Sequence, residues 1–438
     1  MAHEITQKQQ AAFKAAFLQQ PQATTIQRAV MNNGINAVSE DPDVKTKLTN
    51  TFSLSLPTGK ATDQKHSGRC WLFATLNTLR HEVATKLQLP DFEFSENYLS
   101  FWDRFEKANA FYEFVLATAK KPADSRVVTW LFDSPNDDGG QWDNAAALIK
   151  KYGLVPKSVM PETQASANTT EFSQVMGLRL RKDGIKLRQL VAANASQEDL
   201  ARAKKHMLMV IYRLCATAFG TPVEKFDFTY RDKQQQFHRE SGLTPQQFAV
   251  KYLPHSLTDY VTVINSPDKP FNQLYTIPLE TNVVGGQAVT MLNVDLKTMK
   301  ALTLAQLKAG EPVWFGNDVL AQMDRKQGLL ASRLYDYDTL FGADFQLSKK
   351  ARLQYRQAIV SHAMTLSGVD LKAEQPQKWR VENSWGEKVG TKGYFVMADD
   401  WFDAYVYQVV IKRDLLPPAL RTALKATPVQ LAPWDSMG

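Results

Sequence analysis

Segments with a helical pattern and segments with a strand pattern occupy different parts of the chain. Early in the chain, apolar residues recur every three or four positions, as in Trp71–Leu87, which predicts a helix with one buried face. Later, short β-branched or aromatic runs are bounded by turn residues, which predicts strands. These strands are Tyr260–Ile264, Val289–Val294, Pro312–Asn317, Ala363–Val369, Lys378–Asn383 and Gly393–Met397. Helices early and strands late predict an α+β protein with two lobes.

Further helices are expected before the strands begin. The patterns predict helices at Gln7–Phe17, from near Ser95 past Trp102, and at Ala145–Tyr152. Residues 161–260 are rich in Lys, Arg, Gln and Ala, and capping signals at Ser196 and Thr244 predict helix starts there. We interpret 161–260 as a mainly helical insertion.

Composition and cysteine count limit the class of protein. The chain has 438 residues, of which 44% are hydrophobic, so it can bury a large core. The net charge of +7 is mild for this length and does not by itself indicate nucleic-acid binding. There is no run of about 18 apolar residues and no signal-peptide core, and the two cysteines are far apart. We therefore expect a cytoplasmic protein that does not enter a membrane.

The sequence around Cys70 favours a reactive thiol. Cys70 lies at the start of a predicted helix, where free N–H groups and the helix dipole stabilise a thiolate. Ser67-Gly68 provides a turn that lets the backbone approach a substrate. Most lone cysteines are small core residues, and Cys215, within an apolar helical stretch, fits that description.

Three further residues are candidates to act with Cys70. His362 opens a predicted buried strand, where a histidine is either a core residue with satisfied hydrogen bonds or a base at the edge of a cleft. Asn383 ends another strand, and its amide can accept the histidine N–H and orient the ring. Trp385 is expected to shield that hydrogen bond and to take part in substrate binding. The Gln64 amide is expected to point at the oxygen of a tetrahedral intermediate. The order of these residues along the chain predicts nucleophilic catalysis without a metal or cofactor; the order is Gln64, Cys70, His362 and Asn383.

These blocks resemble the papain superfamily of cysteine peptidases. Gly68-Arg69-Cys70-Trp71 is similar to the signature around the nucleophile, although Arg69 departs from it. The resemblance implies that Gly139 and Gly140 line the cleft and bind extended peptide. His362 lies 292 residues after Cys70, whereas the usual separation is roughly 130–150, which fits a large insertion.

A narrower resemblance covers the whole chain. The blocks 64–71, 138–142, 313–319, 381–386 and 433–438 are similar to those of the bleomycin hydrolase and bacterial aminopeptidase C family. This likeness implies a papain-like two-lobe fold with a helical insertion and an N-terminal hook, and a homohexamer that hydrolyses short peptides. We therefore divide the chain into a hook (1–60), a helical lobe with the nucleophile (61–160), the insertion (161–260), a strand-rich lobe with His362 and Asn383 (261–425), and a C-terminal arm entering the cleft (426–438).

The C-terminal arm leaves two peptidase activities open. The resemblance implies that the terminal carboxylate, here on Gly438, holds the amino group of an aminopeptidase substrate. However, Ser436 stands where proline is usual in the aminopeptidases, and the chain stops a few residues earlier. An oligopeptide endopeptidase is therefore the alternative. We prefer an aminopeptidase only because aminopeptidases are the more numerous in the family.

A nucleic-acid-binding protein is an alternative from another class. Some relatives bind nucleic acid through a basic central channel, and the nearest candidate here is Leu178-Arg179-Leu180-Arg181-Lys182. Alternating apolar and basic residues more often form an ordinary solvated face. A catalytically inactive scaffold is disfavoured because Gln64, Cys70, His362 and Asn383 are all present.

Overall fold

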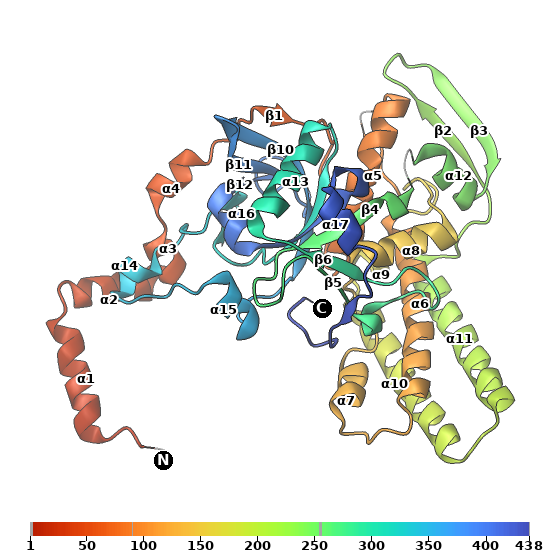
Figure 1. The fold of residues 1–438 in the computed structure, drawn as a ribbon, viewed down its shortest axis with the longest axis horizontal. Coiled ribbons are helices and arrows are strands. Elements are labelled where there is room, and N and C mark those ends of the chain that lie inside the picture. The colour runs from red at the N-terminus through yellow and green to blue at the C-terminus, as the bar shows by residue number, and fades with distance from the viewer. Residues whose placement is uncertain (1–2, 90, 254–255, 438) are drawn as a thin grey trace.

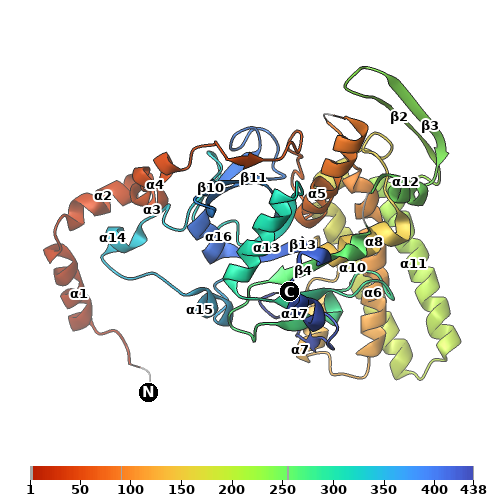
Figure 2. The same ribbon diagram turned by 45° about the horizontal axis from the view of Figure 1, so that its top comes forward.

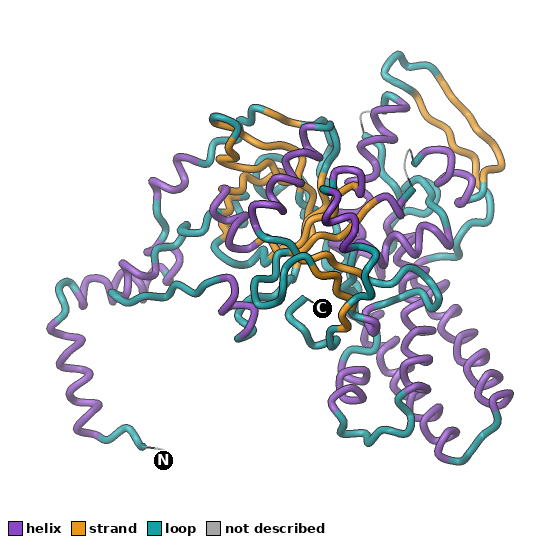
Figure 3. The backbone as a smooth tube through the Cα atoms, viewed as in Figure 1, coloured by secondary structure: helices purple, strands orange, loops and turns teal. Residues whose placement is uncertain are grey.

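The computed structural model describes residues 3–89, 91–253 and 256–437, and its body consists of a helix-rich lobe and a lobe built on one large sheet (Figure 1). Figure 3 shows most of the strands gathered in the centre, one pair of strands at the upper right, and most of the long helices to one side. Each lobe has its own apolar core, one centred on Trp71, Phe101 and Trp142 and the other on Phe315, Trp379 and Phe402. The predicted α+β class is confirmed.

The helix-rich lobe is organised around the helix that begins at Cys70. Three long helices, α6, α10 and α11, lie against one another beside it (Figure 1). Polar residues before the helices supply caps: the Ser95 hydroxyl accepts from the Tyr98 N–H, and Thr244 and Gln247 form a capping box. The helices are α5 (Cys70–Leu87), α6 (Glu96–Ala117), α7 (Arg126–Asp133), α8 (Trp142–Tyr152), α9 (Gln164–Ala167), α10 (Thr170–Ala192), α11 (Gln197–Phe219) and α12 (Pro245–Tyr252).

The other lobe is built on a mixed sheet. Its order, among the described residues, is β14-β5-β6-β4-β13-β7-β10-β11-β12-β9-β8, and β1 also pairs with β10. The strands are β1 (Leu54–Ser55), β4 (Tyr260–Ile264), β5 (Gln273–Thr276), β6 (Thr290–Asn293), β7 (Val313–Asn317), β8 (Met323–Asp324), β9 (Leu329–Leu330), β10 (His362–Lys372), β11 (Gln375–Glu382), β12 (Tyr394–Ala398), β13 (Val406–Lys412) and β14 (Val429–Gln430). The register pairs His362 with Asn317 and Thr365 with Glu382, which fixes the start of β10 in the middle of the sheet.

Shorter elements connect and cover the sheet. Helix α13 packs against β7, β10 and β13, and α16 packs against β11, β12 and β13. These connecting elements are η1 (Leu257–Asp259), η2 (Pro278–Glu280), α13 (Leu296–Lys308), α14 (Tyr337–Phe341), α15 (Lys349–Gln354), α16 (Asp399–Tyr405), η3 (Arg413–Leu415) and α17 (Pro418–Ala423).

The N-terminal segment forms an arm that projects from the body (Figure 2). It consists of α1 (Gln7–Gln19), α2 (Ala23–Asn33), α3 (Ile35–Ser39) and α4 (Pro42–Lys47). A bridge between Glu40 and Tyr335 and contacts between α3 and α14 hold its inner end. None of the residues of α1 is buried, so its outer end has no core of its own.

All six predicted strands and the predicted helices are present, with ends shifted by a few residues. The interpretation of 161–260 as mainly helical missed a hairpin of β2 (Phe226–Arg231) and β3 (Phe237–Leu243), which projects beside α12 (Figure 2). Phe226 and Phe228 are buried while the residues between and after them face outward, so the segment follows a strand period rather than a helical one. Within the described residues, none of the helices combines the length and the hydropathy that crossing a bilayer requires.

Candidate active site

A cleft of about 520 Å³ brings Cys70 and His362 together. Its walls come from both lobes: the start of α5, α6, α7 and the turn 137–141 on one side, and residues 279–282, β7, β10 and β13 on the other. Two residues 292 positions apart therefore meet in one site, as the sequence predicts for a nucleophile and its base.

Cys70 is the first residue of α5 and is only partly exposed. The sulfur accepts hydrogen bonds from the backbone N–H groups of Trp71 and Ala363, which favour the thiolate. Burial acts in the opposite direction and raises the pKa of the Cys70 thiol, because an isolated thiolate would be poorly solvated. The other cysteine, Cys215, is fully buried on α11, and neither is in a disulfide.

His362 opens β10, and its ring is fixed by Asn383. The His362 Nε2 lies 2.9 Å from the Asn383 Oδ1, and both side chains are buried. The same Oδ1 accepts the Ser384 N–H at 2.8 Å, which identifies it as the oxygen rather than the nitrogen of the amide. His362 must then donate from Nε2, which leaves Nδ1 free to accept a proton. Burial lowers the pKa of His362 to about 4, with the Asn383 hydrogen bond opposing the shift.

Trp385 covers the imidazole. Its ring centroid lies 4.9 Å from that of His362 at an interplanar angle of 34°. The Arg325 guanidinium stacks 4.4 Å from the Trp385 ring, and its positive charge further lowers the pKa of His362. Trp385 thus lies against His362, where it must lie if it is to shield the hydrogen bond between His362 and Asn383 from water.

Gln64 is buried and held by the segment that carries Asn383. The Ser384 hydroxyl donates to the Gln64 Oε1 at 2.6 Å, and the Gln64 Nε2 donates to the Ser67 carbonyl at 2.6 Å. An amide nitrogen has two protons, and the Ser67 carbonyl uses only one of them. One turn of chain therefore positions both Gln64 and His362.

The predicted glycines line the cleft, and two of them are required by close packing. A Cβ on Gly140 would lie 2.6 Å from the Trp71 ring, and one on Gly68 would lie 2.5 Å from the Asp138 Cβ. The Gly139 N–H donates to the Asp137 carboxylate at 3.1 Å. Gly68 therefore allows the close approach of Asp138, in addition to the turn that the sequence suggests.

Arg69, which departs from the papain pattern, is a structural residue. It is 2% exposed, and its guanidinium pairs with Glu162 at 2.7 Å and stacks 5.2 Å from the Phe73 ring. A buried, paired arginine at this point ties the start of α5 to the segment that leads into α9.

Among the polar residues of the cleft that sequence reasoning did not identify, Glu280 and Gln408 are notable for their side chains. Glu280, at the end of η2, and Gln408, on β13, both line it. Gln408 is fully buried and its Oε1 has no hydrogen-bond partner among the described residues, while Gly316 leaves the space that the side chain occupies. Nothing in the sequence near Glu280 or Gln408 distinguishes them from other polar residues in a turn or a strand.

The C-terminal arm borders the cleft at Pro433. Pro433 lines it, the Arg126 guanidinium of α7 stacks 4.2 Å from the Trp434 ring, and Asp435 pairs with Lys269 at 3.0 Å. Met437 is fully buried against β5 and its neighbours. Gly438, whose carboxylate the family resemblance implicates in substrate binding, lies outside the described residues.

The basic run at 178–182 lies within α10 and is largely used inside the molecule. Arg179 pairs with Asp183 at 2.7 Å, and Arg181 donates to the carbonyls of Phe132 and Asp133. Leu180 is buried. Such contacts are those of an ordinary helix face packed on its neighbours.

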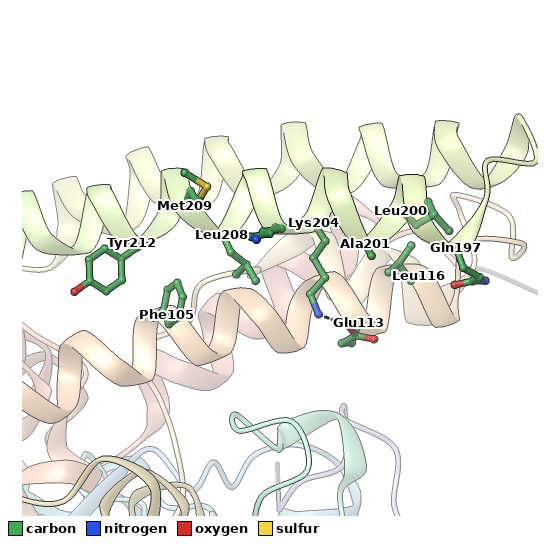
Figure 4. A pocket seen from close by; sticks show the side chains of 11 residues that line it. Phe105, Glu113, Leu116, Gln197, Leu200, Ala201, Lys204, Leu208, Met209 and Tyr212 are labelled. Atoms are coloured by element: carbon green, nitrogen blue, oxygen red, sulfur yellow. Dashed lines mark hydrogen bonds and ion pairs between the residues drawn. The ribbon is translucent and has the colours of Figure 1, made fainter.

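A second hollow, of about 640 Å³, lies between α6 and α11 (Figure 4). It is lined by Phe105, Glu113, Leu116, Gln197, Leu200, Ala201, Lys204, Lys205, Leu208, Met209 and Tyr212. Lys204 and Glu113 form an ion pair across it. This lining contains neither a cysteine nor a histidine, so the cleft at Cys70 is the candidate active site.

Comparisons with known proteins agree with this geometry. The sequence profile of the Peptidase C1-like family matches residues 4–438. The chain is 44% identical to aminopeptidase C of Lactobacillus helveticus, covering 100% of this chain and 99% of that protein. It is 46% identical to aminopeptidase G of Lactobacillus delbrueckii subsp. lactis, covering 100% of both. The crystal structure of PepW from Lactobacillus rhamnosus superposes with a TM-score of 0.98 at 51% identity, covering 100% of this chain and 99% of that one.

The family match and the likeness to PepW extend over nearly the whole chain, including the insertion and the C-terminal arm. They agree with a fold in which a cysteine at a helix start meets a histidine on a central strand. The chain belongs to the Peptidase C1-like family and is a papain-like cysteine peptidase.

Proposed function

We propose that this chain is an aminopeptidase that hydrolyses short peptides, with Cys70 as nucleophile and His362 as acid and base. The observation that carries the proposal is the cleft in which Cys70 and His362 meet while Asn383 orients the imidazole. Four relatives that match this chain over almost its full length are named aminopeptidases C, G, E and W.

The reaction follows from the positions of the protons. The Cys70 sulfur attacks the peptide carbonyl carbon, and the proton of the thiol passes to the free Nδ1 of His362. The imidazolium gives this proton to the leaving amine as the C–N bond breaks, which leaves a thioester on Cys70. His362 then takes a proton from water, the water oxygen attacks the thioester, and the sulfur leaves with the proton restored.

The charged intermediates need local stabilisation. Proton transfer from sulfur to imidazole creates two opposite charges side by side, and their attraction in the poorly hydrated cleft offsets the burial cost of each. The free proton of the Gln64 amide and the backbone N–H of Cys70 are proposed to bind the oxygen of the tetrahedral intermediate. Removing one such donor typically lowers kcat by about a hundredfold or more.

The C-terminal arm supports removal of residues from the amino end. Pro433 occupies part of the cleft, and Trp434 is held by Arg126 and by a 2.6 Å hydrogen bond from Arg356 to its carbonyl. An arm held at this place limits the space for substrate residues on the amino-terminal side of the bond that is cleaved. We therefore propose aminopeptidase activity in preference to the endopeptidase alternative.

A paired assay tests this assignment. One substrate is a short peptide with a free amino group, and the other is the same peptide acetylated at that group; products are identified by mass. An aminopeptidase releases single residues from the free peptide and leaves the acetylated one intact. Internal cleavage of the acetylated peptide at a comparable rate would replace this proposal with the endopeptidase.

The role of Cys70 is tested by substitution, with the other cysteine, Cys215, as the control. Cys70→Ala is expected to abolish hydrolysis while the circular dichroism spectrum stays unchanged, and Cys215→Ala is expected to retain hydrolysis because that thiol is buried away from the cleft. Hydrolysis by Cys70→Ala at a rate near that of the wild type would remove the mechanism.

We also propose that the protein is a cytoplasmic homo-oligomer, by family resemblance a hexamer. In support, α1 exposes Phe13, Phe17 and Leu18, with exposed fractions of 62%, 39% and 56%, on an arm that projects from the body (Figure 2). Apolar side chains gathered on a projecting helix mark an interaction surface. The unpaired state of both cysteines agrees with a reducing compartment.

A further inference from the structure

Glu280 places an unpaired carboxylate in the active-site cleft. It ends the short helix η2, between β5 and β6, and lines the same cleft as Cys70 and His362. The side chain is half-buried, and its oxygens make no hydrogen bond or ion pair with any described residue. A carboxylate withdrawn from water is costly unless a partner compensates for it.

Lys107 is the cation whose charge acts on Glu280, but its ammonium group contacts other acceptors. Lys107 donates to the carbonyls of Asp137 and Gly139, and its ammonium pairs with Asp103 at 2.9 Å. Among the described residues, the Lys107 ammonium thus makes its hydrogen bonds and its ion pair with groups other than the Glu280 carboxylate. Asp137, which also lines the cleft, adds a second negative charge near Glu280.

The backbone around Glu280 is fixed by both walls of the cleft. Its carbonyl accepts from the Asn144 Nδ2 at 2.9 Å. Asn282, two residues on, donates to Asp103 at 2.8 Å and accepts from Asn144 at 3.2 Å. The turn that carries Glu280 is therefore preorganised at the wall of the cleft, which lowers the entropic cost of binding a ligand there.

We propose that Glu280 is a specificity-determining residue that binds a cationic nitrogen of the substrate, either its free α-ammonium group or a Lys or Arg side chain. This inference rests on the peptidase function proposed above. The cation of the substrate supplies the missing partner of the carboxylate, and the low local polarity strengthens the charge-assisted hydrogen bond.

The protonation state of Glu280 is consistent with a missing counter-ion. Burial raises the pKa of Glu280 to about 7, with Asp137 adding to the shift and Lys107 opposing it. A bound cation favours the ionised carboxylate and so lowers this pKa.

The test measures peptide binding in the Cys70→Ala background, where no hydrolysis interferes. Three peptides are titrated by calorimetry: Leu-Gly-Gly amide, whose cation is the α-ammonium; acetyl-Arg-Gly-Gly amide, whose cation is the side chain; and acetyl-Leu-Gly-Gly amide, which has none. Adding Glu280→Gln is expected to raise the Kd of at least one cationic peptide tenfold or more, and to change that of the neutral peptide less than twofold. Which cationic peptide is affected identifies the source of the cation.

Two controls separate charge from shape and location. Glu280→Asp keeps the charge and is expected to retain part of the affinity for the cationic peptide. Glu374→Gln removes an exposed carboxylate that pairs with Lys308 away from the cleft, and is expected to change none of the three Kd values. If Glu280→Gln alters all three peptides equally, or none, the role of Glu280 is overturned while the peptidase proposal stands. If the Cys70→Ala protein binds none of the peptides, the peptidase proposal fails and the role of Glu280 fails with it.

Discussion

At the scale of single residues, the thiol and the imidazole behave as one titrating unit because they share a cleft that is poor in water. The active pair holds one proton. A second proton would put an uncompensated positive charge on His362, and burial lowers the pKa for that step to about 4. The reactive form therefore persists as the pH falls through the ordinary histidine range of about 6.5 and is lost only near about 4.

Alkylation of Cys70 by iodoacetamide checks this prediction, because the reagent is neutral and its own charge does not titrate. The rate should fall with an apparent pKa near about 4 on the acid side. Arg325→Gln removes a positive charge close to Trp385 and His362, so its acid limb should move to higher pH. Cys70→Ala controls for labelling elsewhere. An acid limb at about 6.5 in the wild type would contradict the effect of burial on His362.

The sequence identified Cys70, His362 and Asn383 because each has a local cue, namely a helix start, a strand start and a turn after a strand. The structure places Cys70 and His362 in one cleft and Asn383 in hydrogen-bond contact with His362. Glu280 and Gln408 have no such cue. Their surroundings are created by segments distant in sequence, such as Asn144 for Glu280 and Gly316 for Gln408, so only the folded chain shows that they line the cleft.

At the scale of elements, prediction succeeded where a pattern had clear ends. Strand β4 is bounded by turns and was predicted at its observed limits. Strand β13 was missed although Val406–Lys412 is rich in valine, because it follows α16 directly and no turn residue separates them. The β2–β3 hairpin was missed because its alternation of apolar and polar residues lies within a block of charged, helix-favouring composition.

The C-terminal arm is an element whose removal has a definite expected effect. It is attached by the pairing of β14 with β5 and by the burial of Met437. Deleting residues 432–438 should open the cleft, and the rate on the acetylated peptide relative to the free one should rise by about tenfold or more. Loss of the buried Met437 side chain should also cost about 1.5–3 kcal/mol of stability, measured by denaturant unfolding.

A matched control keeps this test specific to the arm. Lys425→Ala changes an exposed residue just before the arm, and should leave both the peptide preference and the stability unchanged. If the deletion lowers stability as expected but the acetylated peptide remains uncleaved, the arm does not decide between the two peptidase activities.

At the scale of the whole molecule, the catalytic geometry depends on how the two lobes meet. Cys70 belongs to the helix-rich lobe and His362 to the sheet, and α5 packs directly on β10. Buried hydrogen bonds join α5 to the sheet, among them one from the Trp314 indole of β7 to the Trp71 carbonyl at 3.3 Å and one from Thr365 of β10 to the Ala74 carbonyl at 3.2 Å. The distance between sulfur and imidazole is thus set by the packing of α5 on the sheet, and neither partner depends on a flexible loop.

The described part of the N-terminal arm, from residue 3 onward, contributes no residue to the lining of the cleft, so assembly and catalysis can be separated by experiment. In α1, Phe13 and Phe17 are exposed without any intramolecular core. The double substitution of Phe13 and Phe17 by Ser should therefore reduce the mass of the assembly, measured by light scattering, because it removes apolar surface that only another subunit can bury.

The matched control introduces the same residue, Ser, at two charged positions of α1. Substituting Lys8 and Lys14 by Ser should leave the mass unchanged, since both are exposed and polar. In either variant the cleft is intact, and the rate on a short free peptide should remain within about twofold of the wild type, because its chemistry lies entirely within one subunit. If the phenylalanine variant keeps the wild-type mass, the projecting helix does not hold the assembly together. If it keeps the mass but loses activity, the arm acts on the cleft by a route other than assembly.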